Sequence, residues 1–403
     1  MKVLQIDVNC KSSSTGKIVY SLYKGLNKAG HSAAVCYGRG PLVDEPNIFK
    51  FGIDVETIMH AGLTRITGLT GRFSPFSTNR VIRFMEKFQP DVVNIHELHA
   101  YFVDLDPVIN YLKERNIPTV WTFHCEFMYT GKCGHAYDCE QWKTECRRCP
   151  QLRDYPASWF FDFTRKMFHE KKQLLRDFRN LSIVTPSEWL KTRVLQSFLS
   201  DKDVYVIHNG IDTSVFCPRK ADHLRCRHSI SDDEKVVLAV APNLMSESKG
   251  GEWVVRLAQL FEGQSVKFIL IGVDEPSRDY GKNVVVLGRT QDQVELAHYY
   301  SLADVFVICS RRENFPTTCI EALACGTPIV GFDEGGTRET APKGLGKFVA
   351  YGDIDALYGA VLSFITNDHL TDIKSDCVEF ATMHYDESSM LQSYMKLYTK
   401  VKG

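Results

Sequence analysis

The sequence predicts an α/β protein made of two doubly wound domains in series, and three observations lead to that prediction. The chain has 403 residues, which at roughly 100–200 residues per domain corresponds to two or three domains. Short apolar runs alternate with longer stretches of helical periodicity, and this alternation starts again in the second half. Such alternation indicates parallel sheets covered by helices on both faces, the architecture of Rossmann-like domains.

The elements of the first half follow from short buried runs separated by amphipathic stretches. We expect a domain over residues 1–203, and its elements are listed here by number. Strands are predicted at 3–8, 32–37, 92–95, 119–123 and 182–185, and helices at 16–29, 77–88 and 107–115.

The second half repeats the pattern and predicts a second domain over residues 204–385. Strands are predicted at 236–241, 266–271, 284–287, 305–308 and 329–331, and helices at 251–261, 294–302 and 317–325. The dipeptide Asn209-Gly210 marks a turn at the junction. Residues 386–403 read as a terminal helix that can pack back on the N-terminal domain. In open α/β sheets ligands bind beyond the carboxyl ends of the strands, so a cleft between the two domains is the expected site.

Composition excludes several classes of protein. With 24% charged and 44% apolar residues, the chain is neither collagen-like nor wholly disordered. No apolar run approaches the roughly 18–20 residues that cross a bilayer. The first apolar run is too short for a signal peptide, so we expect a cytoplasmic protein. Thirteen cysteines in such a chain indicate buried thiols or a metal site rather than disulfides.

The net charge of −1 hides an asymmetry between the two halves. Residues 1–200 hold 27 Lys and Arg against 20 Asp and Glu, and the remaining residues hold 21 against 29. A basic first half favours an anionic partner such as lipid headgroups, a pyrophosphate-linked acceptor or nucleic acid. A chance excess of solvated side chains is the competing interpretation.

The strongest motif follows the predicted strand 305–308. Glu313 and Glu321 flank a helix start at Pro316, where the free N–H groups of Thr317 and Thr318 could hold a diphosphate. Carboxylates accept hydrogen bonds from sugar hydroxyls, so each glutamate could hold a different sugar-like ring. Taken alone, the pair could also be one loop charge and one solvated or capping charge.

Polar residues also follow the predicted strands of the first domain. The segment 12–17, which contains Thr15 and Gly16, could hold a phosphate or sugar, or could simply cap a helix. His124 directly follows one strand, while His96 and His99 close another at the same sheet edge. They are candidates for a reaction centre and an acceptor pocket, against the alternative of histidines satisfied within the fold.

A cysteine-rich insertion over residues 131–151 is the second distinctive signal. Four thiols within a short stretch, the last two spaced as Cys-x2-Cys, suit tetrahedral zinc. Because four cysteines leave no open coordination position, such a zinc would be structural rather than catalytic. Unligated buried thiols remain the alternative. The four residues are Cys133, Cys139, Cys146 and Cys149.

The chain resembles the retaining glycosyltransferases of the GT-B fold, in glycosyltransferase family four. The resemblance covers both domains, and the cysteine insertion is typical of branches that build bacterial surface polysaccharides. The matching pieces are Val184-Thr185-Pro186-Ser187-Glu188-Trp189-Leu190, Asn209-Gly210-Ile211-Asp212, Leu287-Gly288-Arg289, Tyr300-Ser301-Leu302-Ala303-Asp304, the Glu-x7-Glu motif Glu313…Glu321, and Gly335-Gly336-Thr337-Arg338-Glu339.

The resemblance implies roles for residues of the second domain. Glu313 would hold hydroxyls of the donor sugar, and Glu321 the ribose of the nucleotide. Lys249 matches the family's phosphate-binding lysine, a role that suits a departing diphosphate. The family's arginine six residues earlier is replaced by Asn243, so Arg311, Arg312 or Arg338 would supply that charge, or one cation suffices. The other donor-side residues implied are Phe315, Pro316, Thr317, Thr318, Arg289 and, from the first domain, Gly16.

Roles are implied in the first domain as well. His124 would lie near the donor sugar and the reaction centre, although Cys125 stands where the family usually has an aspartate after this histidine. The acceptor side would include Thr15, His96, His99, Arg65 and Arg72.

The activity implied is retaining transfer of a hexose-type sugar from a UDP- or GDP-linked donor to a glycan acceptor. The acceptor would be lipid-linked, in capsule, O-antigen or exopolysaccharide synthesis at the inner face of the cytoplasmic membrane. No catalytic metal and no nucleic-acid partner are expected. The competing functions are a non-hydrolysing sugar-nucleotide epimerase of the same architecture, a glycoside hydrolase and a zinc-dependent nucleic-acid-binding protein.

Overall fold

The computed structural model describes residues 1–275, 278–290 and 292–403, which form two compact units. The N-terminal unit comprises Met1–His208 together with Met390–Gly403, and the C-terminal unit comprises Asn209–Ser389. The N-terminal unit extends beyond residue 203 because the strand Asp203–Val206 pairs in parallel with its neighbour and completes the sheet. Both units are α/β with all-parallel sheets, as the sequence predicts.

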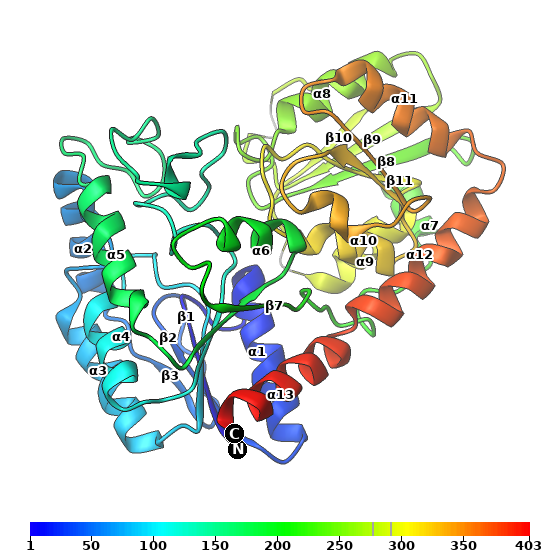
Figure 1. Cartoon of the computed structure of the whole chain (residues 1–403). Helices are drawn as coiled ribbons and strands as arrows, with labels where there is room; N and C mark the ends of the chain where they lie inside the picture. The colour runs from blue at the N-terminus through cyan, green and yellow to red at the C-terminus, as the bar shows by residue number, and fades with distance from the viewer. Residues whose placement is uncertain (276–277, 291) are drawn as a thin grey trace. The chain divides into compact units, whose positions relative to one another are not determined.

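The N-terminal unit is built on a seven-stranded sheet with the order β3-β2-β1-β4-β5-β6-β7 (Figure 1). Its order reverses between β1 and β4, which is the position where doubly wound sheets bind ligands. The strands are β1 (Lys2–Asp7), β2 (Ser32–Tyr37), β3 (Ile48–Lys50), β4 (Val92–Ile95), β5 (Thr119–Thr122), β6 (Leu181–Thr185) and β7 (Asp203–Val206).

Helices cover both faces of this sheet because its central strands are apolar on both sides. One core lies under α1 and α13, and the other lies under α3 to α6. The helices are α1 (Ser13–Lys28), α2 (Asp54–Thr67), α3 (Pro75–Phe88), α4 (Leu105–Glu114), α5 (Thr164–Arg176), α6 (Glu188–Leu195) and α13 (Glu387–Lys402), with a short 3-10 helix at Gln141–Lys143.

The C-terminal helix α13 is an integral part of the N-terminal unit from Met390 onward. Tyr394 and Tyr398 are buried against the sheet, and Leu391 packs so closely on Gly25 of α1 that a Cβ there would lie 2.4 Å from Leu391. Figure 1 shows α13 running beside α1. Glycine at position 25 therefore allows α13 to pack closely against α1.

The C-terminal unit has a six-stranded parallel sheet with the order β10-β9-β8-β11-β12-β13, which reverses between β8 and β11. Its two cores lie on opposite faces of the sheet, one under α9, α10 and α12 and the other under α8 and α11. The elements are β8 (Lys235–Val240), β9 (Val266–Ile271), β10 (Val284–Leu287), β11 (Val305–Ile308), β12 (Ile329–Phe332), β13 (Gly346–Val349), α7 (Asp222–Arg227), α8 (Gly251–Leu260), α9 (Gln293–Leu302), α10 (Thr317–Ala324), the 3-10 helix Thr337–Thr340, α11 (Ile354–Ile365) and α12 (Leu370–Tyr385).

One expectation about the first loop needs correction. Helix α1 begins at Ser13 rather than at residue 16, so Thr15 and Gly16 belong to its first turn and not to a loop before it. Gly16 lies against the backbone that follows β1, where a Cβ would come within 3.2 Å of the Asn9 carbonyl. Among the described residues, no helix is both long and apolar enough to cross a bilayer.

Candidate functional site

Two loops meet at the point where the strand order of the C-terminal unit reverses. One follows β8 and carries Lys249, and the other follows β11 and carries Glu313. Gly250 has a φ of +71°, and a Cβ there would lie 2.0 Å from the Cys309 carbonyl oxygen, so only glycine allows this approach. The Arg311 N–H also donates to the Ser248 carbonyl at 3.0 Å. These contacts fix the two loops against each other.

The side chains of Lys249 and Glu313 form an ion pair in which Nζ lies 2.6 Å from Oε1. Both side chains are only partly exposed, at 33% and 17%, so a ligand could reach them. The backbone of Glu313 is held by the segment after β12, because the Gly336 N–H donates to its carbonyl. A Cβ at Gly335 would lie 1.9 Å from that carbonyl, and φ there is +66°. Two residues for which separate roles at the donor site were predicted are therefore brought together on fixed backbone.

Helix α10 starts directly beyond Glu313, with Pro316 at its N-cap. The backbone N–H groups of Thr317 and Thr318 lie in its first turn, where a helix has no internal acceptors. The Phe315 carbonyl accepts a hydrogen bond from Asn209 at 3.0 Å, which anchors the loop ahead of the helix. This arrangement can bind an anion such as a diphosphate.

The second glutamate of the motif differs from the first in being buried. Glu321 is 7% exposed and accepts a hydrogen bond from the Tyr300 hydroxyl at 3.0 Å. Burial, and next the charge of Glu321, raise the pKa of Tyr300 well above its usual range, so the phenol keeps its proton. Glu321 is thus a fixed acceptor rather than a solvated surface charge.

The arginines that could replace the residue missing at Asn243 differ in how firmly they are paired. Arg312 is held by Glu334 at 3.1 Å and Arg338 by Asp333 at 2.6 Å. Arg311 pairs at 3.6 Å with Glu247, whose side chain is 89% exposed. Asn243 itself is exposed, as is Arg289 just beyond β10. Arg311 is therefore the arginine whose known ion pair would be least costly to exchange for a phosphate.

A second polar cluster occupies the reversal point of the N-terminal sheet, between β1 and β4. Asp7 ends β1 and is buried, and it accepts hydrogen bonds from Thr15 Oγ1 at 3.1 Å and from the Glu97 N–H at 3.1 Å. Burial, and next the charge of Glu97, raise the pKa of Asp7 to about 7. Sequence reasoning missed Asp7, although its position at the end of a buried strand was a usable signal.

His96 and His124 lie side by side in this cluster. Their rings stack at 5.3 Å between centroids, and His96 Nδ1 lies 3.0 Å from His124 Nε2. Burial lowers the pKa of both, and the nearby His124 lowers that of His96 further. Two neutral rings that share one proton between facing nitrogens orient each other, so His96 can fix the orientation of the His124 ring.

The orientation of His96 depends in turn on the C-terminal helix. His96 Nε2 lies 3.0 Å from Gln5 Oε1 and 3.1 Å from Asn94 Nδ2. Both amides donate to the Tyr398 hydroxyl, Gln5 at 3.1 Å and Asn94 at 2.8 Å. A buried chain of hydrogen bonds thus links α13 to the predicted reaction centre. Nothing in the sequence pattern indicated this contact, because it joins residues almost 400 positions apart.

His99 belongs to a separate group with Glu97 and Cys125. In the part of the chain that the structure describes, these three form the one group of histidine, cysteine and acidic residues whose ligand atoms all lie within 4.8 Å of one another. His99 Nδ1 lies 2.8 Å from Glu97 Oε2. Burial raises the pKa of Glu97, but the charge of His99 and its hydrogen bond outweigh this and hold the value at about 2. Such a mixed donor set could hold a transition metal.

The two arginines expected on the acceptor side lie in different surroundings. Arg65 belongs to α2, and its guanidinium lies 5.7 Å from the ring centroid of Tyr101. Arg72 pairs with Glu170 of α5 at 2.8 Å. Both are half-buried. Their side chains are not gathered with His96 and His99 by any described contact.

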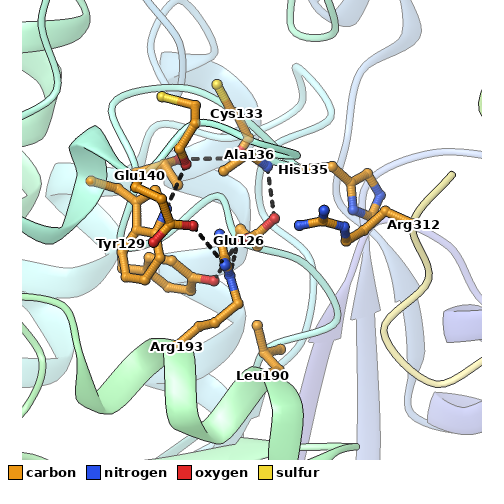
Figure 2. A network of polar contacts seen from close by, with 12 residues as sticks. Glu126, Tyr129, Cys133, His135, Ala136, Glu140, Leu190, Arg193 and Arg312 are labelled. Carbon is orange, nitrogen blue, oxygen red and sulfur yellow. Dashed lines mark hydrogen bonds and ion pairs between the residues drawn. The ribbon is translucent and has the colours of Figure 1, made fainter. Parts of the chain in front are cut away.

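The cysteine insertion is tied to the rest of its unit by a buried ion pair (Figure 2). Glu126 accepts hydrogen bonds from Arg193 Nε at 2.7 Å, from the Tyr129 hydroxyl at 2.8 Å and from the Ala136 N–H at 2.7 Å. Arg193 also lies 4.4 Å from the centroid of Trp142. A buried charge with all these partners is costly to disrupt, so the insertion has a defined position on α6.

The four cysteines line one cavity of about 20 Å³, large enough for a single ion or water molecule. The Gly131 N–H donates to Cys146 Sγ at 3.2 Å, and a hydrogen bond from Cys133 lowers the pKa of Cys149 to about 7. No three of these sulfur atoms lie within 4.8 Å of one another. In a tetrahedral zinc site neighbouring sulfur atoms are about 3.8 Å apart. The donor set fits zinc, and coordination requires rotation of these side chains.

Two buried lysines lie near these cysteines, and one of them, Lys132, lines the cavity. Lys132 donates to the carbonyls of Asp154 and Pro156, and Lys171 donates to the Phe127 carbonyl at 2.5 Å. Burial lowers the pKa of both, to about 7 for Lys171, against the opposing effect of nearby thiols. A zinc ion with four thiolates carries a net charge of −2, and such a charge nearby would favour the protonated form of both lysines.

The titration of Asp7 leads to a prediction about stability. Because its pKa is about 7 when folded and about 3.9 when unfolded, the folded state keeps a proton that the unfolded state has lost between these values. Stability therefore falls as pH rises through this window, by a few kcal/mol at most. Asp7→Asn removes this titration. We therefore expect the difference in melting temperature, variant minus unmodified protein, to increase from about pH 5 to about pH 8. A constant difference across that range would contradict a raised pKa.

Comparison with solved structures defines the class of protein. Sucrose-phosphate synthase from Thermosynechococcus elongatus has a TM-score of 0.73 at 17% identity, with 99% of this chain and 98% of that one covered. Anabaena HepE in complex with UDP-glucose has a TM-score of 0.67 at 15% identity, with 99% and 100% covered. The fold is that of the two-domain GT-B proteins.

Comparison with family models then identifies the family. Residues 15–215 match the model described as Glycosyltransferase Family 4, and residues 234–367 match the model described as Glycosyl transferases group 1. The chain belongs to this family of glycosyltransferases. A full-length relative is the putative colanic acid biosynthesis glycosyl transferase WcaC of Escherichia coli K12, 24% identical over 99% of both chains.

Proposed function

We propose that the protein is a retaining glycosyltransferase that moves a hexose-type sugar from a UDP- or GDP-linked donor to a glycan acceptor. The observation that carries this proposal is the contact between Lys249 and Glu313 at the reversal point of the C-terminal sheet, directly before the N-terminus of α10. A cation, a carboxylate and free helix amides at one point match the phosphates and hydroxyls of a nucleotide sugar.

The proposed chemistry assigns each group one task. Lys249 and the amides of Thr317 and Thr318 stabilise the diphosphate as the glycosidic bond breaks and negative charge develops on it. Glu313 orients the sugar through its hydroxyls, and Glu321 accepts from the ribose. The leaving phosphate takes the proton of the acceptor hydroxyl on the same face of the sugar, so no side chain acts as general base. Arg311 is the arginine proposed to support Lys249.

The N-terminal unit is proposed to present the acceptor. His96 and His99 follow β4, His124 follows β5, and Thr15 of α1 donates to Asp7 at the end of β1, so hydroxyl and imidazole groups at this sheet edge can bind a glycan. We propose that the acceptor is a lipid-linked glycan of a cell-surface polysaccharide. The relative WcaC is named for colanic acid biosynthesis, which supports the polysaccharide part of this proposal. No catalytic metal and no nucleic acid takes part in this proposal.

A panel of nucleotide sugars tests the proposal. A ligand that binds only the folded state raises the melting temperature by mass action, so the best stabiliser identifies the donor. We expect UDP- or GDP-sugars to stabilise the protein and free sugars to have no effect. Nuclear magnetic resonance of the product should show the donor's anomeric configuration retained. Conversion of donor alone into an epimer would instead favour a sugar-nucleotide epimerase.

We also propose that the four cysteines hold a structural zinc ion. The shared cavity, the N–H donor to Cys146 and the two buried lysines support this. Gently purified protein should contain one zinc per chain, and chelation should lower the melting temperature. Cys149→Ser should lose the metal, while Cys226→Ser, which changes an exposed cysteine of α7, should keep it. Protein without zinc at full stability would refute this.

A further inference from the structure

Helix α2 has its apolar side chains on the outside. Its buried face is polar and consists of Glu56, Thr57, His60 and Thr64. A helix on a water-exposed surface shows the opposite pattern, with apolar residues inward. The exposed face of α2 consists of Val55, Ile58, Met59, Leu63 and Ile66.

This exposed face has the spacing of one continuous stripe. Its members recur at intervals of three and four residues, so they lie along one side of the helix. Ile58 is 72% exposed and Met59 is 60% exposed. Single exposed apolar residues are ordinary, whereas a stripe along a whole helix marks an interaction surface.

An aromatic run continues the surface beyond the end of α2. Trp159, Phe160, Phe161 and Phe163 are all exposed, Phe160 to 68% and Trp159 to 56%. The backbone N–H of Trp159 donates to the backbone carbonyl of Arg65 at 2.7 Å, which fixes the run against the last turn of α2. A Cβ at Gly68 would lie 2.5 Å from the Phe161 carbonyl oxygen, so the two segments are in contact.

The charges beside the aromatic run are predominantly basic. Residues 143–166 contain six Lys or Arg and three Asp or Glu. Arg165 and Lys166 follow the run after Thr164, with side chains 67% and 54% exposed, and they pair with Glu145 and Glu170. The Cys149 N–H donates to Asp162 at 2.7 Å, which brings the exposed Arg147 and Arg148 close to the same run. Figure 1 shows α2 and α5 on the same side of the unit, and the Thr70 N–H donates to Met167 of α5.

We propose that the exposed face of α2 and residues 159–163 form a patch that binds the surface of an anionic lipid bilayer. Aliphatic side chains and aromatic rings enter the boundary between headgroups and acyl chains, where Trp and Phe are favoured. The basic residues beside them face the anionic headgroups. The patch would bind at the surface of the bilayer without crossing it. This proposal does not depend on the chemistry proposed for the C-terminal unit.

Vesicle sedimentation with the full-length protein tests the proposal. We expect binding to vesicles of phosphatidylcholine with phosphatidylglycerol, weaker binding to phosphatidylcholine alone, and weakening by salt because headgroup attraction is screened. The double variants Ile58→Ser/Met59→Ser and Trp159→Ser/Phe160→Ser should each reduce the partition coefficient at least about tenfold, since each removes two inserted side chains. Leu42→Ser, which changes a residue 81% exposed outside the patch, is the matched control and should bind normally.

Fluorescence quenching gives a second measurement, and its first step needs only the unmodified protein. All five tryptophans lie in the described part of the chain. Trp159 is exposed, and the other four are buried or half-buried. Brominated lipids should quench the fluorescence of the unmodified protein, and Trp159→Phe should abolish that quenching while vesicle binding persists. Absence of vesicle binding by the unmodified protein would overturn the proposal. The proposal would also be overturned if the protein formed a dimer and the patch variants dissociated it without changing vesicle binding, because the surface would then contact a second copy of the chain.

Discussion

Replacing Glu313 by Gln is expected to reduce kcat/KM by about 10²–10³-fold, because in the proposed mechanism the carboxylate makes a charged contact with the sugar that strengthens as the bond breaks. Stability should change by less than about 1 kcal/mol, since the ion pair with Lys249 is partly exposed and glutamine has the same volume. Steady-state kinetics and a thermal melt measure the two effects on the same preparation.

The matched control is Glu379→Gln, which changes an exposed glutamate of α12 in the same unit. It should leave both activity and melting temperature unchanged. Turnover of the Glu313 variant at the level of the unmodified protein would remove this residue from the site.

Replacing Lys249 by Met is expected to lower kcat by about 10²–10³-fold, because in the proposed mechanism the diphosphate would then leave without the cation that stabilises it. Methionine keeps the length of the side chain while removing the charge. Lys282→Met, at an exposed lysine of the same unit, should have no effect on activity.

The two losses should not multiply in the double variant. Lys249 Nζ and Glu313 Oε1 lie 2.6 Å apart, and residues in direct contact depend on each other. We expect the variant with both changes to lose clearly less than the product of the two single effects. Independent effects would show that the residues act at separate places.

Strands formed by apolar runs were the most predictable part of the fold, including β10, which is half-exposed at a sheet edge. The runs that form β2, β4, β9, β10 and β11 were delimited correctly from their apolar residues alone. The strands that were not predicted are the edge strands β3 and β13, with β7 at the other edge of its sheet. They are three or four residues long, and each contains a charged residue, so none has a continuous apolar run such as that of β10.

Helix α2 was missed for a different reason. Its buried residues are polar and its apolar residues face outward, so its pattern does not indicate which face is buried. The same inversion that hid the helix from sequence analysis is the observation that carries the proposed membrane contact. Local pattern and packing disagree where a surface serves a partner.

The candidate site was predictable where it consists of a contiguous motif. Glu313, Thr317, Thr318 and Glu321 lie on one strand-to-helix connection, and their relative placement follows from local geometry. Asp7 and Tyr398 were not predictable as site neighbours, because a buried hydrogen-bond partner has no signature until distant elements meet.

The amino-acid order by itself determined the two parallel sheets, the strand-to-helix loops and the presence of a glutamate pair around a helix start. These depend on hydrophobic period and turn chemistry, which act over a few residues. Only the tertiary structure decided that Lys249 faces Glu313, that His96 faces His124, and that α13 supports the pair through Tyr398. Those pairings join side chains from separate elements, and their distances are set by the packing of helices on the sheets rather than by any local propensity.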